Sequence, residues 1–282
     1  MRRGILFMLV SIVFFSLMYS ISKGLTETYP VLQIVWARYV LFVGFSFAPA
    51  LRFGAGAVLR TRRLVLQVVR SALLVGATAC ALAGYSYLHL ADANALGSIS
   101  PLLVTLLSAL VLGEAVGWRR WLAIAGGFAG TLIILRPGAG AFDWAALLPV
   151  CASALYANYQ ITTRMLSNVD SEATTLFYSG TVGAIALTLL LPFIWVPPDL
   201  EGWAVLLLVA VLGTGGQVCV IRALTSAPAS SLQPYAYVQL PFMALVGFVL
   251  YDEVPDFWTY VGAAVVVASG LYAWHRSRVK GG

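Results

Sequence analysis

Long stretches without a single charged side chain dominate this sequence. Residues 173–198, 202–221 and 229–251 contain no Asp, Glu, Lys or Arg. Of the 282 residues, 61% are hydrophobic and only 10% are charged, whereas a soluble domain carries about 25% charged residues. An apolar run of about 18 residues or more is long enough to cross a bilayer as a helix. The sequence therefore predicts an integral membrane protein.

The distribution of the apolar runs predicts an all-α polytopic membrane protein with ten transmembrane helices. The boundary between the third and fourth spans is the hardest to place, because "YSYLHLADAN" is almost continuous with both. The expected spans are 4–22, 31–50, 64–84, 90–112, 118–136, 143–163, 172–195, 202–223, 230–251 and 257–274.

The basic residues predict the orientation, since short cytoplasmic loops are enriched in Lys and Arg. With the N-terminus in the cytoplasm, an even number of spans places the C-terminus there too. The net charge of +6 then reflects topology and needs no nucleic-acid partner to explain it. Fourteen of the seventeen basic residues fall on the inner side: Arg2, Arg3, Arg52, Arg60, Arg62, Arg63, Arg70, Arg119, Arg120, Arg164, Arg222, Arg276, Arg278 and Lys280.

One segment occurs twice with the charge after it reversed. "LLSALVLGEAVGWRRW" (106–121) is followed by arginines, and the similar "LVGFVLYDEVPDFWTY" (245–260) ends among acids. Because five spans is an odd number, a second set of five enters the membrane from the opposite side. Glu114 then faces the cytoplasm, and Glu253, or Asp252 if the register shifts by one, faces outward. The sequence predicts two inverted five-helix repeats, residues 1–139 and 140–282.

Other parts of the repeat support this division. "SLMYSISKGL" aligns with "SALYANYQITTRML", which pairs Tyr19 with Tyr156 and Lys23 with Gln160. "YLHLADA" (87–93) likewise resembles "ALTSAPA" (223–229). Inverted repeats can exchange conformations and so open a central site to each side of the membrane in turn. The repeat predicts a transporter with its site between the two halves.

The repeated pattern also carries a family resemblance. An apolar run with a proline, then "LGE" and a glycine-rich helix, resembles the EamA-type family of the drug/metabolite transporter superfamily. "SPLLVTLLSALVLGE" (100–114) matches best, whereas "LPFMALVGFVLYDE" lacks the family's glycine before the glutamate. The resemblance implies export or exchange of small metabolites such as amino acids, nucleobases, amines or drugs. Within the family, the chain is most similar to the amino-acid exporters of the YddG group.

Polar side chains inside a span are costly and usually mark a transport pathway. Tyr156, Tyr159 and Gln160 share one face of the sixth span, and Tyr19 and Lys23 share the matching face of the first. Two related polar stripes could form the walls of a shared cavity. Alternatively, the same hydroxyl and amide groups could join neighbouring helices.

Arg38 is the one fixed charge deep within a span. Its guanidinium matches a carboxylate with two parallel hydrogen bonds, which would suit a carboxylate-bearing cargo. An internal structural contact is the alternative. Lys23 lies nearer the outer mouth, where it could attract anions or pair with Glu27.

Further candidates lie in the third, eighth and ninth spans. Tyr85 and His89 stand one turn apart near the outer end, where His89 could contact cargo or cap the break between spans. Prolines at 234 and 241 loosen the ninth span by removing backbone donors. The remaining predicted substrate-binding residues are Gln217, Tyr237 and Gln239.

Several other functions are disfavoured. The two histidines, His89 and His275, lie on opposite sides of the membrane, and no cluster of nucleophiles or paired acids is present, so no enzyme is expected. No "GxxxxGK" loop is present, so ATP is not the direct driver. Neither a metal site nor a cofactor is expected, since the cysteines lack metal-ligand spacing and fit a packing role. These cysteines are Cys80, Cys151 and Cys219.

The sequence thus predicts a transporter in the bacterial inner (plasma) membrane that exports small metabolites by alternating access. Aromatic or other neutral amino acids are the expected cargo, since tyrosines outnumber fixed charges on the polar stripes. A multidrug, nucleobase or amine efflux carrier of the same fold is the alternative, although a pump for cations would want a membrane-embedded acid. The expected partners are the small-molecule cargo and the lipid bilayer, and no partner protein is indicated.

Overall fold

The computed structural model describes residues 2–53, 59–112, 118–135, 144–167, 169–227 and 229–279. Within these ranges the chain is helical and contains no strand. The helices are α1 Arg2–Leu25, α2 Val31–Phe53, α4 Leu64–Tyr87, α5 Leu90–Gly97, α6 Ser100–Leu112, α7 Trp118–Leu135, α8 Leu147–Leu166, α9 Glu172–Leu190, α10 Leu200–Ser226, α11 Ala229–Ala236, α12 Gln239–Tyr251 and α13 Phe257–Val279. Short 3-10 helices cover Trp144–Ala146 and Leu191–Phe193.

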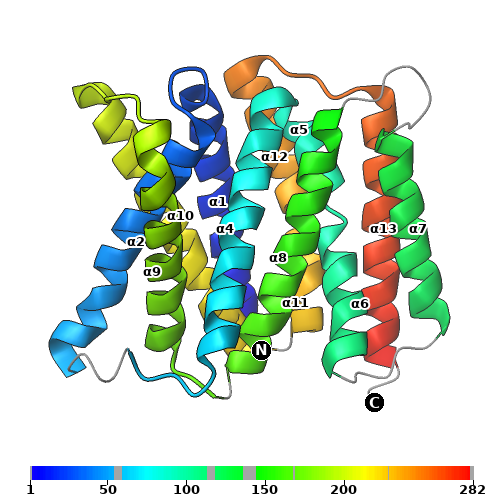
Figure 1. The fold of residues 1–282 in the computed structure, drawn as a ribbon. Helices are drawn as coiled ribbons and strands as arrows, with labels where there is room; N and C mark the ends of the chain where they lie inside the picture. Colours follow the sequence, from blue (N-terminus) through cyan, green and yellow to red (C-terminus); the bar gives the residue numbers. More distant parts are fainter. Residues whose placement is uncertain are drawn as a thin grey trace.

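The helices stand side by side in one bundle (Figure 1). Stretches long and apolar enough to cross a membrane are Arg2–Leu25, Leu64–Tyr87, Leu90–Leu112, Glu172–Phe193 and Leu200–Ser226. Many large apolar side chains are exposed, among them Leu189, Phe193 and Val249. Such exposure suits hydrocarbon and not water. The all-helical class is confirmed, and the number of spans stays a prediction.

The same helix contacts occur twice. α1 packs along α10, and α8 packs along α4 in the same way. α5 contacts α12, and α6 contacts α11. The start of α1 and the end of α13 lie at the same end of the bundle (Figure 1). Each of the two central contacts therefore joins a helix from the first half of the chain to one from the second half.

Both expected helices at the centre of the repeats are interrupted. α5 gives way to α6 at Ser98, and α11 gives way to α12 between Pro234 and Pro241. Pro101, in the first turn of α6, has no N–H to offer the carbonyl of Gly97. That carbonyl instead accepts a hydrogen bond from Ser153 Oγ of α8 at 2.9 Å. The break thus exposes backbone groups to the neighbouring repeat, as membrane helices allow only next to protein or a cavity.

Two boundaries differ from the prediction in a way that matters for the site. α1 continues to Leu25, so Lys23 lies in its last turn. α4 continues to Tyr87, and Leu88 and His89 are extended before α5 begins. Glu114 and the predicted boundary between residues 139 and 140 lie outside the described residues.

Arg70, assigned to the inner side, corrects the prediction that Arg38 is the one fixed charge deep within a span. It lies in α4 with 0% exposure. Its guanidinium donates to the Thr175 carbonyl and to Ser179 Oγ, both at 2.7 Å, and to Thr163 Oγ1 at 3.3 Å. Arg70 therefore ties α4 to α8 and α9. These contacts could not be predicted from the sequence, because the three partners lie about a hundred residues away along the chain.

Asp170 anchors the connection before α4, at the end of the bundle that carries the start of α1. Its carboxylate accepts hydrogen bonds from Thr61 Oγ1 at 2.5 Å, Gln67 Nε2 at 2.8 Å and the Arg62 N–H at 3.2 Å. Burial raises the pKa of Asp170, but these hydrogen bonds lower it by more, so its pKa lies below the usual value.

A carboxylate with a lowered pKa stabilises the fold at all pH values above its unfolded pKa, and this contribution disappears as pH falls through the folded pKa. We expect the free energy of unfolding of the parent protein to decrease at pH values below about 4. The Asp170→Asn variant should lose this acid-dependent step. Melting temperatures in detergent between pH 3 and pH 7 measure both. An unchanged acid profile in the variant would contradict the assignment.

Candidate functional site

A cavity lies between the two halves of the bundle. Its volume is about 150 Å³, roughly ten times what a single buried water needs. Side chains from α1, α2, α4, α8 and α10 line it, together with the interrupted helices. The cavity therefore lies where the interrupted helices of the two halves, α5–α6 and α11–α12, come together.

Aromatic rings form much of the wall. The rings of Tyr19 and Tyr85 lie 4.9 Å apart, joining α1 to α4. Tyr156 faces the cavity from α8 and stacks on Tyr159, with ring centroids 5.6 Å apart and an angle of 20°. Phe15 lies beside Tyr19 at 6.3 Å. Such rings bind flat, partly apolar groups well.

Amide side chains provide the polar part of the wall. Gln233 Nε2 donates to Gln160 Oε1 at 3.0 Å, which joins α11 to α8. Asn94 Nδ2 donates to the Tyr85 hydroxyl at 3.3 Å. Amides offer both donors and acceptors, so this wall can bond to carbonyl, amide or hydroxyl groups of a cargo.

Arg38 is 2% exposed and lines the same cavity. It donates to Gln217 Oε1 at 3.1 Å and to Thr78 Oγ1 at 3.3 Å. Gln217 Nε2 in turn donates to the Tyr159 hydroxyl at 2.6 Å, so one chain of hydrogen bonds links α2, α10 and α8. In the described part of the protein no carboxylate lies within ion-pair distance of Arg38. Its charge is solvated by neutral groups and by the Phe15 and Tyr39 rings, each at 5.6 Å.

Several buried polar atoms of the cavity wall have no hydrogen-bond partner within the described residues. They are Arg38 Nε, Ser100 Oγ, Gln233 Oε1 and the Tyr237 hydroxyl. Unpaired buried polar atoms are rare in proteins and call for an explanation. A polar cargo would supply partners for Ser100 Oγ and Gln233 Oε1. Arg38 Nε, by contrast, lies against Gly213 of α10, and the Tyr237 hydroxyl lies against Gly270 of α13.

Most of the predicted site residues line this cavity: Tyr19, Arg38, Tyr85, Tyr156, Gln160, Gln217, Tyr237 and Gln239. Tyr159 does not. It is fully buried behind Tyr156, under the guanidinium of Arg70 at 5.3 Å. Prediction missed Asn94 and Gln233. Gln233 stands four residues before Tyr237, so the spacing rule that selected Tyr156 and Gln160 could have found it.

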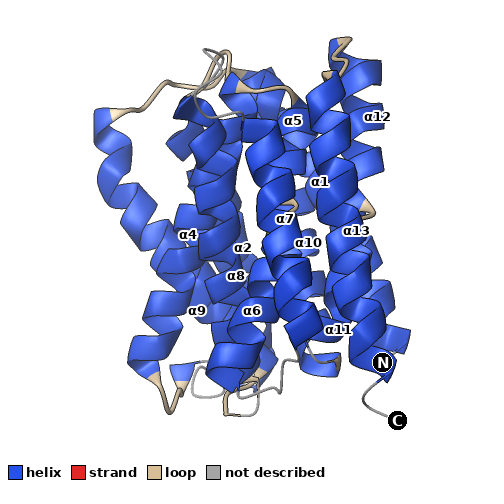
Figure 2. Cartoon of the chain, turned by 90° about the vertical axis from the view of Figure 1, so that its right-hand side faces the viewer, coloured by secondary structure: helices blue, strands red, loops and turns tan. Residues whose placement is uncertain are grey.

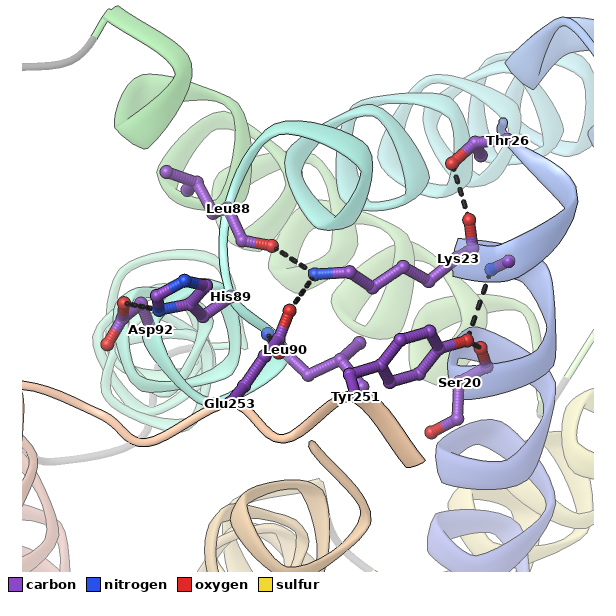
Figure 3. Close-up of polar contacts among 10 residues, drawn as sticks. Ser20, Lys23, Thr26, Leu88, His89, Leu90, Asp92, Tyr251 and Glu253 are labelled. Carbon is purple, nitrogen blue, oxygen red and sulfur yellow. Dashed lines mark hydrogen bonds and ion pairs between the residues drawn. The ribbon is translucent and has the colours of Figure 1, made fainter. Parts of the chain in front are cut away.

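Lys23 and His89 do not line the cavity. Lys23 lies in the last turn of α1, at the end of the bundle opposite the start of that helix (Figure 1), and His89 lies close to it (Figure 3). Lys23 forms an ion pair with Glu253 and not with Glu27. His89 occupies the N-cap position of α5 but makes no side-chain cap bond. Its imidazole is 54% exposed and lies 3.3 Å from the Asp92 carboxylate.

Comparison with known proteins identifies a family that the chain matches and several related transporters. The model of the EamA-like transporter family matches it twice, over residues 2–136 and 143–273. A riboflavin transporter of Vibrio cholerae is 36% identical over 171 residues, which cover 60% of this chain and 57% of that protein. A riboflavin transporter of Rhizobium johnstonii is 30% identical over 95% of this chain and 90% of its own length. The pseudopaline exporter CntI of Pseudomonas aeruginosa is 27% identical, covering 95% of both.

A solved crystal structure has the same fold, with a TM-score of 0.71 and 17% identity over 98% of this chain and 97% of that chain. At this identity the likeness concerns the fold alone. The family match, by contrast, spans nearly the whole sequence and includes both of its halves. The chain belongs to the EamA-like transporter family, and it is an integral membrane protein.

Proposed function

We propose that this protein exports a small, ring-bearing metabolite through the central cavity by alternating access. Members of its family and its named relatives are transporters of small metabolites. One observation carries the proposal further than the family does. Aromatic rings, amide side chains and the buried Arg38 line the same cavity.

The proposed topology has ten spans in two inverted repeats, residues 1–139 and 140–282, with both termini in the cytoplasm of a bacterial inner membrane. The twofold match of the family model supports the division. The repeated helix contacts and the paired helix breaks support the inversion. The cluster of arginines between α2 and α4 supports a cytoplasmic position for that end.

Riboflavin is the first candidate cargo, because two relatives are named for its transport and its flat ring system carries several hydrogen-bonding groups. The cavity of about 150 Å³ is smaller than ordinary ligand pockets, so in this proposal it widens when one end opens to admit the cargo. An aromatic amino acid is the second, since Arg38 could pair with its carboxylate. The resemblance to the amino-acid exporters of the YddG group favours this second candidate. A cationic drug fits less well, because the described lining contains no Asp or Glu.

Counterflow into liposomes that hold the purified protein tests the cargo. Vesicles are loaded with unlabelled riboflavin, tryptophan or an organic cation, and uptake of the labelled compound is followed. We expect saturable counterflow of riboflavin, absent from empty vesicles. Counterflow of tryptophan alone would favour the amino-acid exporter. Counterflow of the cation alone would contradict the proposed cargo class.

The Tyr156→Ala and Gln160→Ala variants test the cavity wall. Each removes one stacking or hydrogen-bonding group worth about 1.4 kcal/mol, so the apparent affinity for cargo should fall about tenfold. Tyr260→Ala is the matched control, because Tyr260 is exposed on α13 away from the cavity. Parent-like transport by both cavity variants, at normal protein levels, would show that these residues only pack the helices.

A further inference from the structure

The end of the bundle opposite the start of α1 is held by a small polar cluster (Figure 3). Lys23 Nζ donates to Glu253 Oε1, and also to the Leu88 carbonyl at 2.7 Å. Glu253 Oε2 accepts from the Leu90 N–H at 2.7 Å. The side chains of Lys23 and Glu253 are only 15% and 10% exposed. The pair is therefore enclosed by the helices that it joins.

The extended junction between α4 and α5 explains why both charges are held there. Leu88 ends α4 and presents a carbonyl without a helical partner, whereas Leu90 begins α5 and presents a free N–H. The carbonyl end of a helix favours a cation, and the N–H end favours an anion. The junction therefore offers a place for Lys23 and, beside it, a place for Glu253.

The direction of the Glu253 side chain is set by the end of α12. Asp252 adopts a left-handed conformation with φ of 53°, which Asp tolerates better than most residues. The Glu253 N–H then turns back to the Gly247 carbonyl at 3.1 Å. Tyr251, just before this turn, donates its hydroxyl proton to the Ser20 carbonyl and accepts from the Gly24 N–H at 3.1 Å.

An apolar layer separates this polar cluster from the cavity. It consists of Tyr85, Leu90, Ala93 and Met243, with Tyr19, Leu88 and Tyr251 packed against them. Tyr19 and Tyr85 also line the cavity, so the layer forms its ceiling. Met243, Tyr251 and Glu253 come from the second half of the chain, and the other members come from the first. Both the polar cluster and the apolar layer beneath it must separate for the cavity to open at this end.

We infer that the Lys23–Glu253 pair is the latch of an outer gate, and that Lys23 acts on cargo passage through this latch without contacting cargo. Removing an enclosed pair of charges from water costs free energy that offsets much of their attraction, so the pair holds this end closed by only a modest net amount. The latch can therefore open and close repeatedly. The inference rests on the proposed alternating access and on the proposed orientation, which places this end outside the cell.

The other end of the bundle offers a matched contact. Arg164, in the last turn of α8, donates to the Leu224 carbonyl near the end of α10 at 3.0 Å. Lys23 makes the same kind of contact from the last turn of α1 to the end of α4. Removing Arg164 therefore deletes a comparable cation-to-carbonyl bond without touching the proposed latch.

Thiol labelling can measure the gate directly. A cysteine at Ala77, which lines the cavity, serves as reporter in a chain whose native cysteines are replaced by alanine. A membrane-impermeant methanethiosulfonate reagent is applied to intact cells. We expect Lys23→Met and Glu253→Gln each to speed labelling about tenfold, the shift in an equilibrium that ~1.4 kcal/mol produces. Because both changes break one interaction, the double variant should label no faster than the faster single variant.

Three outcomes would overturn the latch. Folded Lys23→Met and Glu253→Gln proteins could label no faster than the parent. Arg164→Met could speed labelling as much as they do, which would indicate general loosening. The acceleration could also appear only in inside-out vesicles, which would place the pair on the inner side. Labelling needs no cargo, so a wrong cargo would leave this result intact and would show only in the counterflow assay.

Discussion

Replacing Arg38 by methionine is expected to abolish transport while the protein still folds. The guanidinium is buried, lines the cavity and has one N–H without a partner in the described protein. Truncating one partner of a buried, hydrogen-bonded charge commonly costs about 2–5 kcal/mol in binding. The ratio kcat/KM for cargo should therefore fall about 100-fold or more.

Stability should respond differently. Arg38 has no carboxylate partner among the described residues, so methionine removes a buried charge without orphaning an opposite one. The variant leaves Gln217 Oε1 and Thr78 Oγ1 without this donor. These two bonds are longer than the two 2.7 Å bonds of Arg70, so we expect Arg38→Met to lose less stability than Arg70→Met. A purely structural role for Arg38 would instead lower the melting temperature and leave transport per folded molecule unchanged. Counterflow rates and melting in detergent, measured on one preparation, separate the two.

Arg70→Met is the matched control. Arg70 is also a fully buried arginine, but its hydrogen bonds go to Thr163, Thr175 and Ser179, and it does not line the cavity. We expect this variant to melt earlier and yet to keep most of its transport per folded molecule. Loss of transport in both variants to the same degree would indicate that a buried charge, and not a cargo contact, is what matters.

The sequence was most informative where one helix supplied the pattern. Tyr156 and Gln160 lie four residues apart, so they had to share a face of α8, and the repeat extended this face to Tyr19. These three residues do meet at one cavity. Helix periodicity is a local property, and local properties can be read from neighbouring letters.

Long-range pairing was not readable in this way. Lys23 belonged to the same predicted stripe as Tyr19, but one further turn carries it past the cavity to Glu253, which is 230 positions away. The sequence alone does not distinguish a residue that lines the cavity, such as Tyr19, from one that closes its end, such as Lys23. Pro234 and Pro241 predicted a loosened ninth span, and the structure goes further by dividing it into α11 and α12. The use of the α4–α5 junction as a charge-binding site depends on three-dimensional packing.

Replacing Gly130 by leucine is expected to destabilise the protein strongly. α7 and α13 lie side by side in both views, at the right-hand edge of the bundle in Figure 1 and facing the viewer in Figure 2. A Cβ at Gly130 would lie 2.9 Å from the Gly262 carbonyl and 3.0 Å from the Val266 nitrogen. A Cβ at Gly262 would in turn lie 2.7 Å from the Gly130 carbonyl. The two backbones touch, so no side chain fits between them.

Small residues let membrane helices approach closely, and van der Waals contact then drives their association. Leucine at position 130 must push α13 away along its whole contact with α7. Overpacking of this kind costs about 3 kcal/mol, a large share of the roughly 5–15 kcal/mol that holds a typical protein folded. We expect low yield and early melting in detergent. Gly44→Leu is the control, since a Cβ at Gly44 meets nothing within 4 Å, and it should behave like the parent. Equal behaviour of the two leucine variants would mean that α7 and α13 do not depend on this contact.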